Sequence, residues 1–225
     1  KSQEYEGEVY GGALAWSGNY KLSFQVSEDR MLHIVSGMNP FAAALALDKG
    51  DEVTTPKMVL TYSSEGKNRM SQNFHHWSRK YALAHGNSQR PVILNSWEGT
   101  GVKFNEEKIC AMIDDAASLG IELFVLDDGW FGKRDNDWCA LGDWEVNEEK
   151  IKGGLPALAE KIHGLGLKFG LWVEPEMISE DSDLYREHPD WALKIPGRAM
   201  NRSRHQLNLD ITRKEVREHI MNQIF

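Results

Sequence analysis

Hydrophobic and polar positions follow two different periods along this chain of 225 residues. In the first part, short apolar segments alternate with polar neighbours, and Tyr20, Leu22, Phe24 and Val26 form one such series. An alternation of two is typical of a half-buried strand, and turn residues separate the segments. The pattern predicts that residues 1–66 form part of an antiparallel β-sandwich.

A helix is predicted between this part and the next. Met70, Phe74, Trp77 and Tyr81 recur at spacings of four, three and four, which places all four on one apolar stripe. A run rich in glycine, asparagine and proline then breaks the helix. We assign residues 67–90 to this linking helix and to the domain boundary that follows it.

From Pro91 onward the pattern changes to strands that alternate with helices. The predicted strands are residues 91–97, 121–126, 167–173 and 206–211, and the predicted helices have their caps or first residues at Asn105, Pro156, Asp181 and Glu215. Such alternation with short turns predicts a parallel sheet. Because chemically active residues follow successive strands, an eight-stranded barrel is favoured over a doubly wound sheet. Residues 91–225 would supply about half of that barrel.

Acidic and aromatic side chains gather where three of these strands end. Trp97 and Trp172 lie at the ends of two of them, and the run Asp127-Asp-Gly-Trp130 follows the third. The carboxyl ends of parallel strands meet at one edge of a sheet, so these side chains are expected to lie together. Indoles offer flat apolar walls to the C–H face of a sugar ring, and eight tryptophans is a high number for this length. The sequence therefore predicts a carbohydrate pocket.

Asp127 and Asp128 are the central candidates of this pocket. Adjacent residues on a regular strand point to opposite faces, so the two carboxylates converge only where the strand ends and the backbone turns at Gly129. There they would accept hydrogen bonds from neighbouring sugar hydroxyls, and charged acceptors make such bonds about twice as strong as neutral ones. A strand-end cap or a pair with an arginine is the alternative interpretation.

Three other groups of charged residues carry a weaker signal. Glu174 and Glu176 either contact or orient a substrate, or they cap the following loop. Arg204 either reaches the pocket or is a solvated surface arginine. The charged run at residues 133–137, which includes Arg134, is interpreted as an exposed and mobile loop.

Composition argues against several classes of protein. The net charge of -8 is unlike that of nucleic-acid binders, and no apolar run approaches the ~20 residues that span a bilayer. The two cysteines form neither a disulfide framework nor a metal knuckle. We expect no cofactor, no metal, and no nucleic-acid or membrane partner. Two alternatives stay open: a non-catalytic sugar-binding module, and a magnesium enzyme whose ligands would be Asp127, Asp128, Glu174 and Glu176.

Longer motifs extend through both parts of the chain. Those of the second part are Asn95-Ser-Trp-Glu98, Phe124-Val-Leu-Asp-Asp-Gly-Trp-Phe-Gly-Lys-Arg134, Leu141-Gly-Asp-Trp144, Lys168-Phe-Gly-Leu-Trp-Val-Glu-Pro-Glu-Met177 and His188-Pro-Asp-Trp191. Those of the first part are Ser17-Gly-Asn19, Gly37-Met-Asn-Pro-Phe41 and Tyr62-Ser-Ser-Glu-Gly66. Together they resemble glycoside hydrolase family 36, the large microbial α-galactosidases, over essentially the whole chain.

The resemblance implies an architecture and an activity. Family members have an N-terminal β-supersandwich, a (β/α)8 catalytic barrel and a C-terminal β-domain, and this chain would start in the first and end midway through the second. They hydrolyse terminal α-1,6-linked galactose from melibiose, raffinose and related oligosaccharides with retention of configuration. By motif match, Asp127 and Asp128 would bind galactose hydroxyls, Trp97 and Trp172 would shape the pocket, and Arg204 would approach the substrate.

The catalytic carboxylates are expected elsewhere in the parent protein. A retaining glycosidase needs a nucleophile and an acid/base about 5 to 5.5 Å apart. The resemblance puts the nucleophile in a Lys-Trp-Asp motif, which this sequence lacks, and the acid/base later still, so both would lie beyond Phe225 and the isolated chain would be inactive.

Some features of the parent protein stay open. The run Arg202-Ser-Arg-His-Gln206 departs from the family's usual Arg-Asn-Gln by a histidine. A galactosyl-transferring enzyme of the raffinose-synthase type is the alternative activity. The resemblance implies a tetrameric parent, and we expect it to be cytoplasmic.

Overall fold

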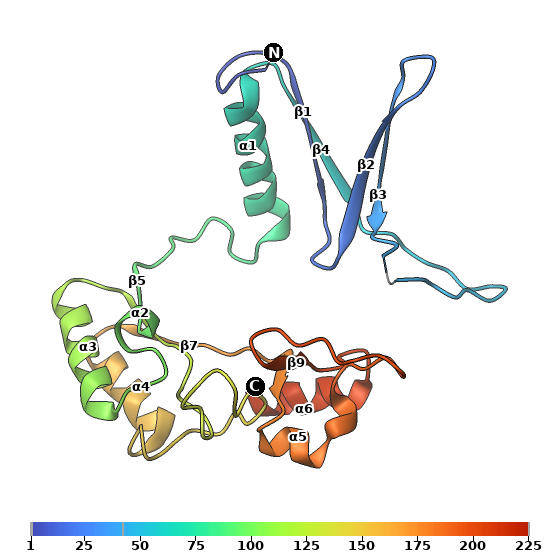
Figure 1. Ribbon diagram of the computed structural model, residues 1–225. Helices are drawn as coiled ribbons and strands as arrows, with labels where there is room; N and C mark the ends of the chain where they lie inside the picture. The colour runs from blue at the N-terminus through green and yellow to red at the C-terminus, as the bar shows by residue number, and fades with distance from the viewer. Residues whose placement is uncertain (1, 42, 225) are drawn as a thin grey trace. The chain divides into compact units, whose positions relative to one another are not determined.

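The computed structural model of the chain describes residues 2–41 and 43–224, and it divides into two compact units, Lys1–Gln89 and Arg90–Phe225 (Figure 1). The first unit is built from strands and one long helix, whereas the second alternates strands with helices. A β-rich N-terminal part followed by an α/β part is thereby confirmed.

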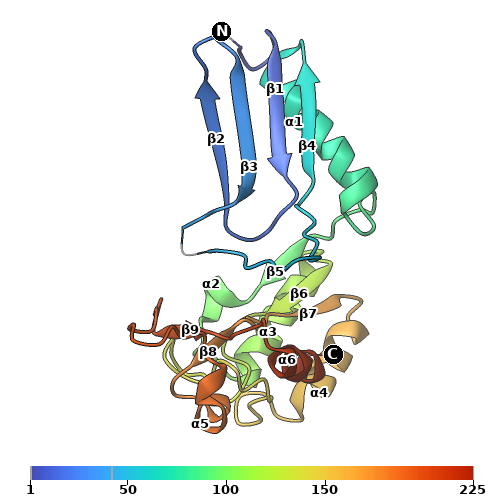
Figure 2. The same cartoon turned by 90° about the vertical axis from the view of Figure 1, so that its right-hand side faces the viewer.

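The first unit contains two antiparallel strand pairs, whose strands face the viewer in Figure 2. β1 (Val9–Leu14) pairs with β4 (Met58–Ser63), and β2 (Tyr20–Val26) pairs with β3 (Leu32–Met38). The predicted strand at residues 20–26 is confirmed, but its half-burial is wrong for the described chain. Phe24 and Val26 are 65% and 66% exposed, because none of the described residues covers this face.

The helix of the first unit is α1 (Gly66–Trp77), and one π-helical turn, η1 (Ser78–Ala82), continues it. α1 packs on β1 and β4, and its Met70 and Phe74 lie so close to Gly11 that a Cβ there would be 2.6 Å from the Met70 sulfur. The predicted apolar stripe is confirmed at these two positions. Tyr81, at the other end, is 67% exposed, so the stripe is not buried throughout.

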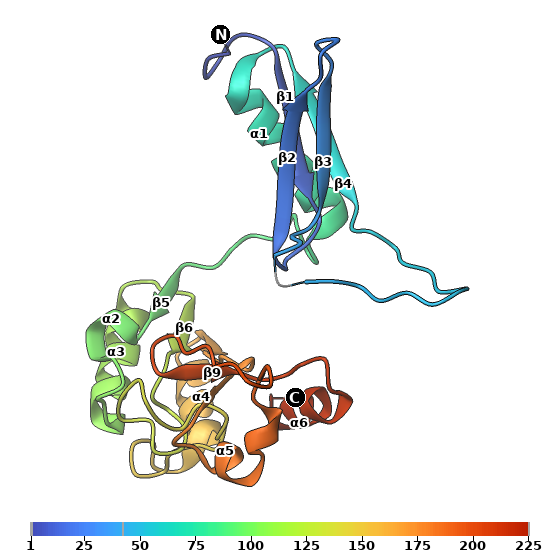
Figure 3. The same ribbon diagram turned by 45° about the vertical axis from the view of Figure 1, so that its right-hand side comes forward.

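Three parallel strands form the sheet of the second unit, and Figure 2 labels all three. They are β5 (Ile93–Asn95), β6 (Leu123–Leu126) and β7 (Lys168–Leu171), paired in that order. Figure 3 shows β5 and β6 from another direction. The connecting helices are α2 (Trp97–Thr100) and α3 (Glu106–Ser118) between the first two strands, and α4 (Gly154–Gly164) before the third. The predicted parallel sheet is confirmed for these strands, although Trp97 begins a short helix and does not end a strand.

The remaining elements of the second unit contribute to a second hydrophobic cluster. They are β8 (Met177–Ser179), α5 (Asp183–Glu187), the 3-10 turn η2 (Pro189–Trp191), β9 (Gln206–Asn208) and α6 (Lys214–Ile224). β9 pairs antiparallel with β8. The prediction of a fourth parallel strand at residues 206–211 is therefore wrong, because its hydrogen-bonding partner is β8 and not the parallel sheet.

Helix starts were predicted with mixed success. The Asn105 side chain accepts a hydrogen bond from the Lys108 N–H at 3.0 Å, which confirms this cap and contributes about 1 kcal/mol. α5 is capped by Ser182, whose hydroxyl oxygen accepts from the Tyr185 N–H at 3.0 Å, so the prediction of Asp181 is wrong by one residue. α4 begins two residues before the expected Pro156.

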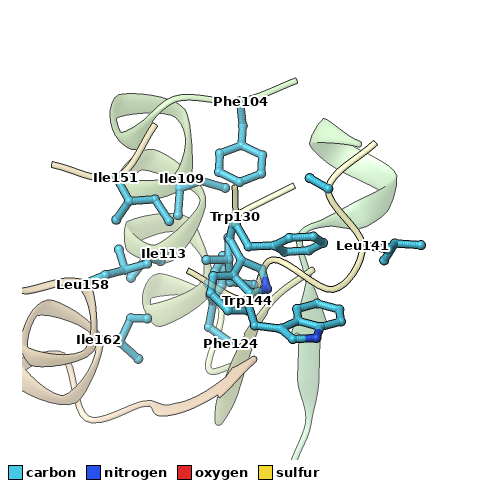
Figure 4. Packing of buried hydrophobic residues seen from close by; sticks show 14 of the residues in the cluster. Phe104, Ile109, Ile113, Phe124, Trp130, Leu141, Trp144, Ile151, Leu158 and Ile162 are labelled. Atoms are coloured by element: carbon cyan, nitrogen blue, oxygen red, sulfur yellow. The ribbon is translucent and has the colours of Figure 1, made fainter. Parts of the chain in front are cut away.

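Packing between the sheet and its helices forms the main hydrophobic core (Figure 4). Ile109 and Ile113 of α3, Ile162 of α4 and Phe124 of β6 are all 0% exposed. Each such side chain contributes roughly 1.5–3 kcal/mol when it leaves water. This core fixes the carboxyl ends of β5 and β6, where the predicted site lies. No described helix is long and apolar enough to cross a membrane.

Candidate functional site

Asp127 follows β6 and is held by two donors. Its Oδ2 accepts from the Asn95 Nδ2 at 2.6 Å, and its Oδ1 accepts from the Asp128 N–H at 2.8 Å. The other end of the same Asn95 amide, Oδ1, accepts from the Trp97 N–H at 2.8 Å. One amide at the end of β5 therefore fixes two of the predicted site residues relative to each other.

Asp128 is buried and paired with Arg134. The Arg134 Nε donates to Oδ1 at 2.9 Å and its Nη2 to Oδ2 at 2.8 Å, while Nη1 donates to the Cys139 carbonyl oxygen at 2.9 Å. Asp128 is 3% exposed and Arg134 is 0% exposed. The interpretation of Arg134 as part of an exposed loop is wrong, because this fork-shaped pair fixes both side chains.

A tight turn brings these residues together. Gly129 has φ +103, and a Cβ there would lie 2.8 Å from the Val102 Cα, so the position requires glycine. The Lys150 ammonium group stabilises the turn, because its Nζ donates to the carbonyl oxygens of Val102, Gly129 and Arg134 at 3.1, 3.0 and 2.7 Å. The backbone turn expected after the strand is present. The Lys150 contacts that stabilise it were not indicated by the sequence.

The three tryptophans of the predicted pocket have different surroundings. Trp97 is 37% exposed. Trp172 is half-buried, and its backbone N–H donates to the Leu126 carbonyl oxygen at 2.9 Å. Its ring stacks on that of Phe131, with 6.3 Å between the ring centroids. Trp130 is 3% exposed and its Nε1 donates to the Trp172 carbonyl oxygen, so it belongs to the core and is not a pocket wall.

Glu174 has an unusual environment for a carboxylate. Its Oε2 is buried and has no hydrogen-bond partner among the described residues. Burial first, and then the neighbouring Glu176 carboxylate, raise the pKa of Glu174 above 4.5. A carboxyl with a raised pKa binds its proton more tightly in the folded state. Its contribution to stability is therefore complete below the unfolded pKa and is lost as pH rises through the folded pKa.

Arg204 is exposed and is linked to the aspartate pair through other charges. Its Nη2 lies 3.2 Å from the Asp137 Oδ1, and that same oxygen is 3.7 Å from the Arg134 Nη2. The predicted residue therefore lies at the outer end of a chain of charges that begins at Asp128.

The described residues contain no group of three His, Cys, Asp or Glu side chains able to hold a metal ion. Asp128 already pairs with Arg134. The four acids therefore do not form the ligand set that the magnesium alternative needs.

Comparison with known proteins decides the family. The Melibiase family model matches residues 52–225, and the model of the glycosyl hydrolase family 36 N-terminal domain matches residues 1–48. The chain belongs to glycosyl hydrolase family 36. The resemblance carried by the longer motifs is thereby confirmed.

Similar proteins cover the whole chain at substantial identity. It is 46% identical over 226 residues to the α-galactosidase AgaA of Geobacillus stearothermophilus and 44% identical over 225 residues to the α-galactosidase Mel36A of Lactobacillus acidophilus, with 99% of this chain covered in both. The solved structure of AgaA matches 99% of the chain with a TM-score of 0.95 at 46% identity. The chain spans 31% of each of these relatives, about a third of their length.

Three residues of the candidate site were missed or misread in the sequence. Asn95 lies inside a quoted motif, but its double role needs the pairing of β5 with β6 to be known. Arg134 was expected in an exposed charged run, and Lys150 was given no role, because the contacts of both depend on partners brought together by the turn at Gly129.

Proposed function

We propose that the full-length protein is a retaining α-galactosidase that removes terminal α-1,6-linked galactose from raffinose-type oligosaccharides. The relatives at 44% to 46% identity are named α-galactosidases, and solved relatives include variants of AgaA in complex with raffinose and with stachyose. In this proposal the chain supplies a large part of the galactose pocket.

The paired carboxylates after β6 carry the proposal. Each oxygen of Asp127 and of Asp128 accepts one hydrogen bond from the protein. A carboxylate oxygen offers about two lone-pair sites, so each one retains capacity for a sugar hydroxyl. Trp97 and Trp172 lie at the ends of the two neighbouring strands and would form apolar walls. Arg204 would approach the substrate from the outer side.

Neither aspartate is assigned to the chemical step. We assign both to galactose binding, and we place the nucleophile and the acid/base beyond Phe225. Their separation in a retaining enzyme would be about 5 to 5.5 Å. The isolated chain is accordingly expected to be inactive.

The same proposal covers the architecture of the parent. The consecutive parallel order β5, β6, β7 supports residues 91–225 as the first half of a (β/α)8 barrel. Residues 1–66 would belong to an N-terminal β-supersandwich and residues 67–90 to the link between the two domains. We also keep a homotetramer in the cytoplasm as part of the proposal.

Hydrolysis assays on the full-length protein test the proposed activity. We expect cleavage of p-nitrophenyl α-galactoside, no comparable cleavage of the α-glucoside or β-galactoside, and α-galactose as the first product in a proton NMR time course. Cleavage of another glycoside while the α-galactoside stays intact would overturn the proposal. With excess sucrose, raffinose as the main product would instead favour a galactosyl-transferring enzyme.

A further inference from the structure

A strained hairpin precedes β9. Ser203 and Gln206 exchange two backbone hydrogen bonds of 3.2 and 2.9 Å, and the two residues between them, Arg204 and His205, have φ of 51 and 60. Two-residue hairpin turns with positive φ at both positions usually carry Asn-Gly, because larger side chains are disfavoured there. An arginine followed by a histidine indicates that both side chains have a role at this turn.

The two side chains contact two adjacent residues of another loop, Asp137 and Trp138. Arg204 pairs with Asp137 at 3.2 Å, and the His205 ring lies 4.6 Å from the Trp138 ring at an interplanar angle of 45°. Two adjacent residues of the hairpin thus meet two adjacent residues of the loop. The Asp137 carboxylate in turn lies 3.7 Å from the Arg134 guanidinium, which pairs with Asp128.

An open groove lies between Trp97 and the Asp137 side of this contact. It has a volume of about 370 Å³, and its lining includes Trp97, Asn136 and Asp137. Trp138 follows Asp137 in the chain and remains 62% exposed although its ring contacts that of His205. The lining of the groove therefore includes a predicted wall of the galactose pocket, Trp97, and the residue next to the solvent-exposed Trp138.

We propose that Trp138 and His205 form a platform for the sugar unit that follows the terminal galactose in an oligosaccharide. A pyranose has an apolar C–H face that fits an indole, and its hydroxyl rim would meet Asn136, Asp137 and Arg204. The inference rests on the proposed function and deepens it, because it assigns these residues to recognition of the longer substrate and not to galactose itself.

The test compares a long and a short substrate on the full-length protein. Replacing Trp138→Ala should lower the ratio of kcat/KM for raffinose to kcat/KM for p-nitrophenyl α-galactoside about five- to tenfold, the size expected for loss of one aromatic stacking contact. Trp138→Phe should restore most of the ratio. Trp16→Ala, which removes another exposed indole, should leave the ratio at the wild-type value.

A second variant keeps the turn while removing the histidine ring. His205→Asn suits the left-handed backbone and should lower the same ratio about threefold, since the platform loses its smaller ring. An unchanged ratio in both Trp138→Ala and His205→Asn overturns the inference, and so does an equal fall for both substrates. If the wild-type protein cleaves no α-galactoside at all, the proposed function fails first, which separates the two outcomes.

Discussion

Replacing Arg134 by methionine should destabilise the turn that carries the aspartate pair. The side chains of Arg134 and Asp128 are 0% and 4% exposed, and two hydrogen bonds of 2.9 and 2.8 Å join them. Methionine keeps much of the volume but leaves a buried carboxylate without its cation. Breaking a buried ion pair in this way costs about 3–5 kcal/mol.

Hydrogen exchange of the full-length protein measures this loss locally. A cost of about 3 kcal/mol should lower the protection of peptides within residues 123–141 by roughly a hundredfold, since about 1.4 kcal/mol corresponds to a factor of ten. Arg186→Met is the matched control. Its side chain is 56% exposed and pairs with Asp181 and Asp183, and because solvent screens such a surface pair, little loss of protection is expected.

A double variant tests the reason for the loss. When Asp128→Asn is added to Arg134→Met, the uncompensated charge disappears, and part of the protection should return. Two results would refute the reasoning: an effect of Arg134→Met no larger than that of Arg186→Met, or a double variant less protected than the single one.

Three other changes follow from the same site. Asn95→Ala removes a hydrogen bond to a charged group, which is worth about 1.5–3 kcal/mol, so kcat/KM for the aryl galactoside should fall at least tenfold; an unchanged value would contradict the positioning role. Glu174→Gln should raise the melting temperature at neutral pH, where the ionised carboxyl opposes folding, and leave it unchanged below pH 4, where the carboxyl is protonated. The same difference at both pH values would contradict this. Gly129→Ala should abolish galactose binding, since its Cβ would meet Val102, and calorimetry that shows wild-type affinity would refute the close approach.

Local signals predicted much of the fold. The start of α3 could be predicted because Asn105, the acids after it and the apolar spacing all lie within a few residues. The alternation of strands and helices predicted the parallel sheet for the same reason. The partner of β9 could not be predicted, because a three-residue strand carries no sign of whether β7 or β8 lies beside it.

The candidate site shows the same division between local and distant information. Asp127 and Asp128 stood out because two carboxylates follow an apolar strand. Arg134 did not, because a charged run looks solvated unless the turn at Gly129 is known to fold it back onto Asp128. Trp130 and Trp172 look alike in sequence, and packing alone separates the core indole from the one near the surface.

Galactose titration of the full-length protein tests the central claim most directly. Calorimetry of the wild type should show one galactose site per chain, and Asp127→Asn and Asp128→Asn should each weaken it at least tenfold, because each removes charged acceptors from sugar hydroxyls. Asp115→Asn, an exposed aspartate on α3, should bind like the wild type. Wild-type affinity in both site variants would contradict the assignment of this aspartate pair to galactose.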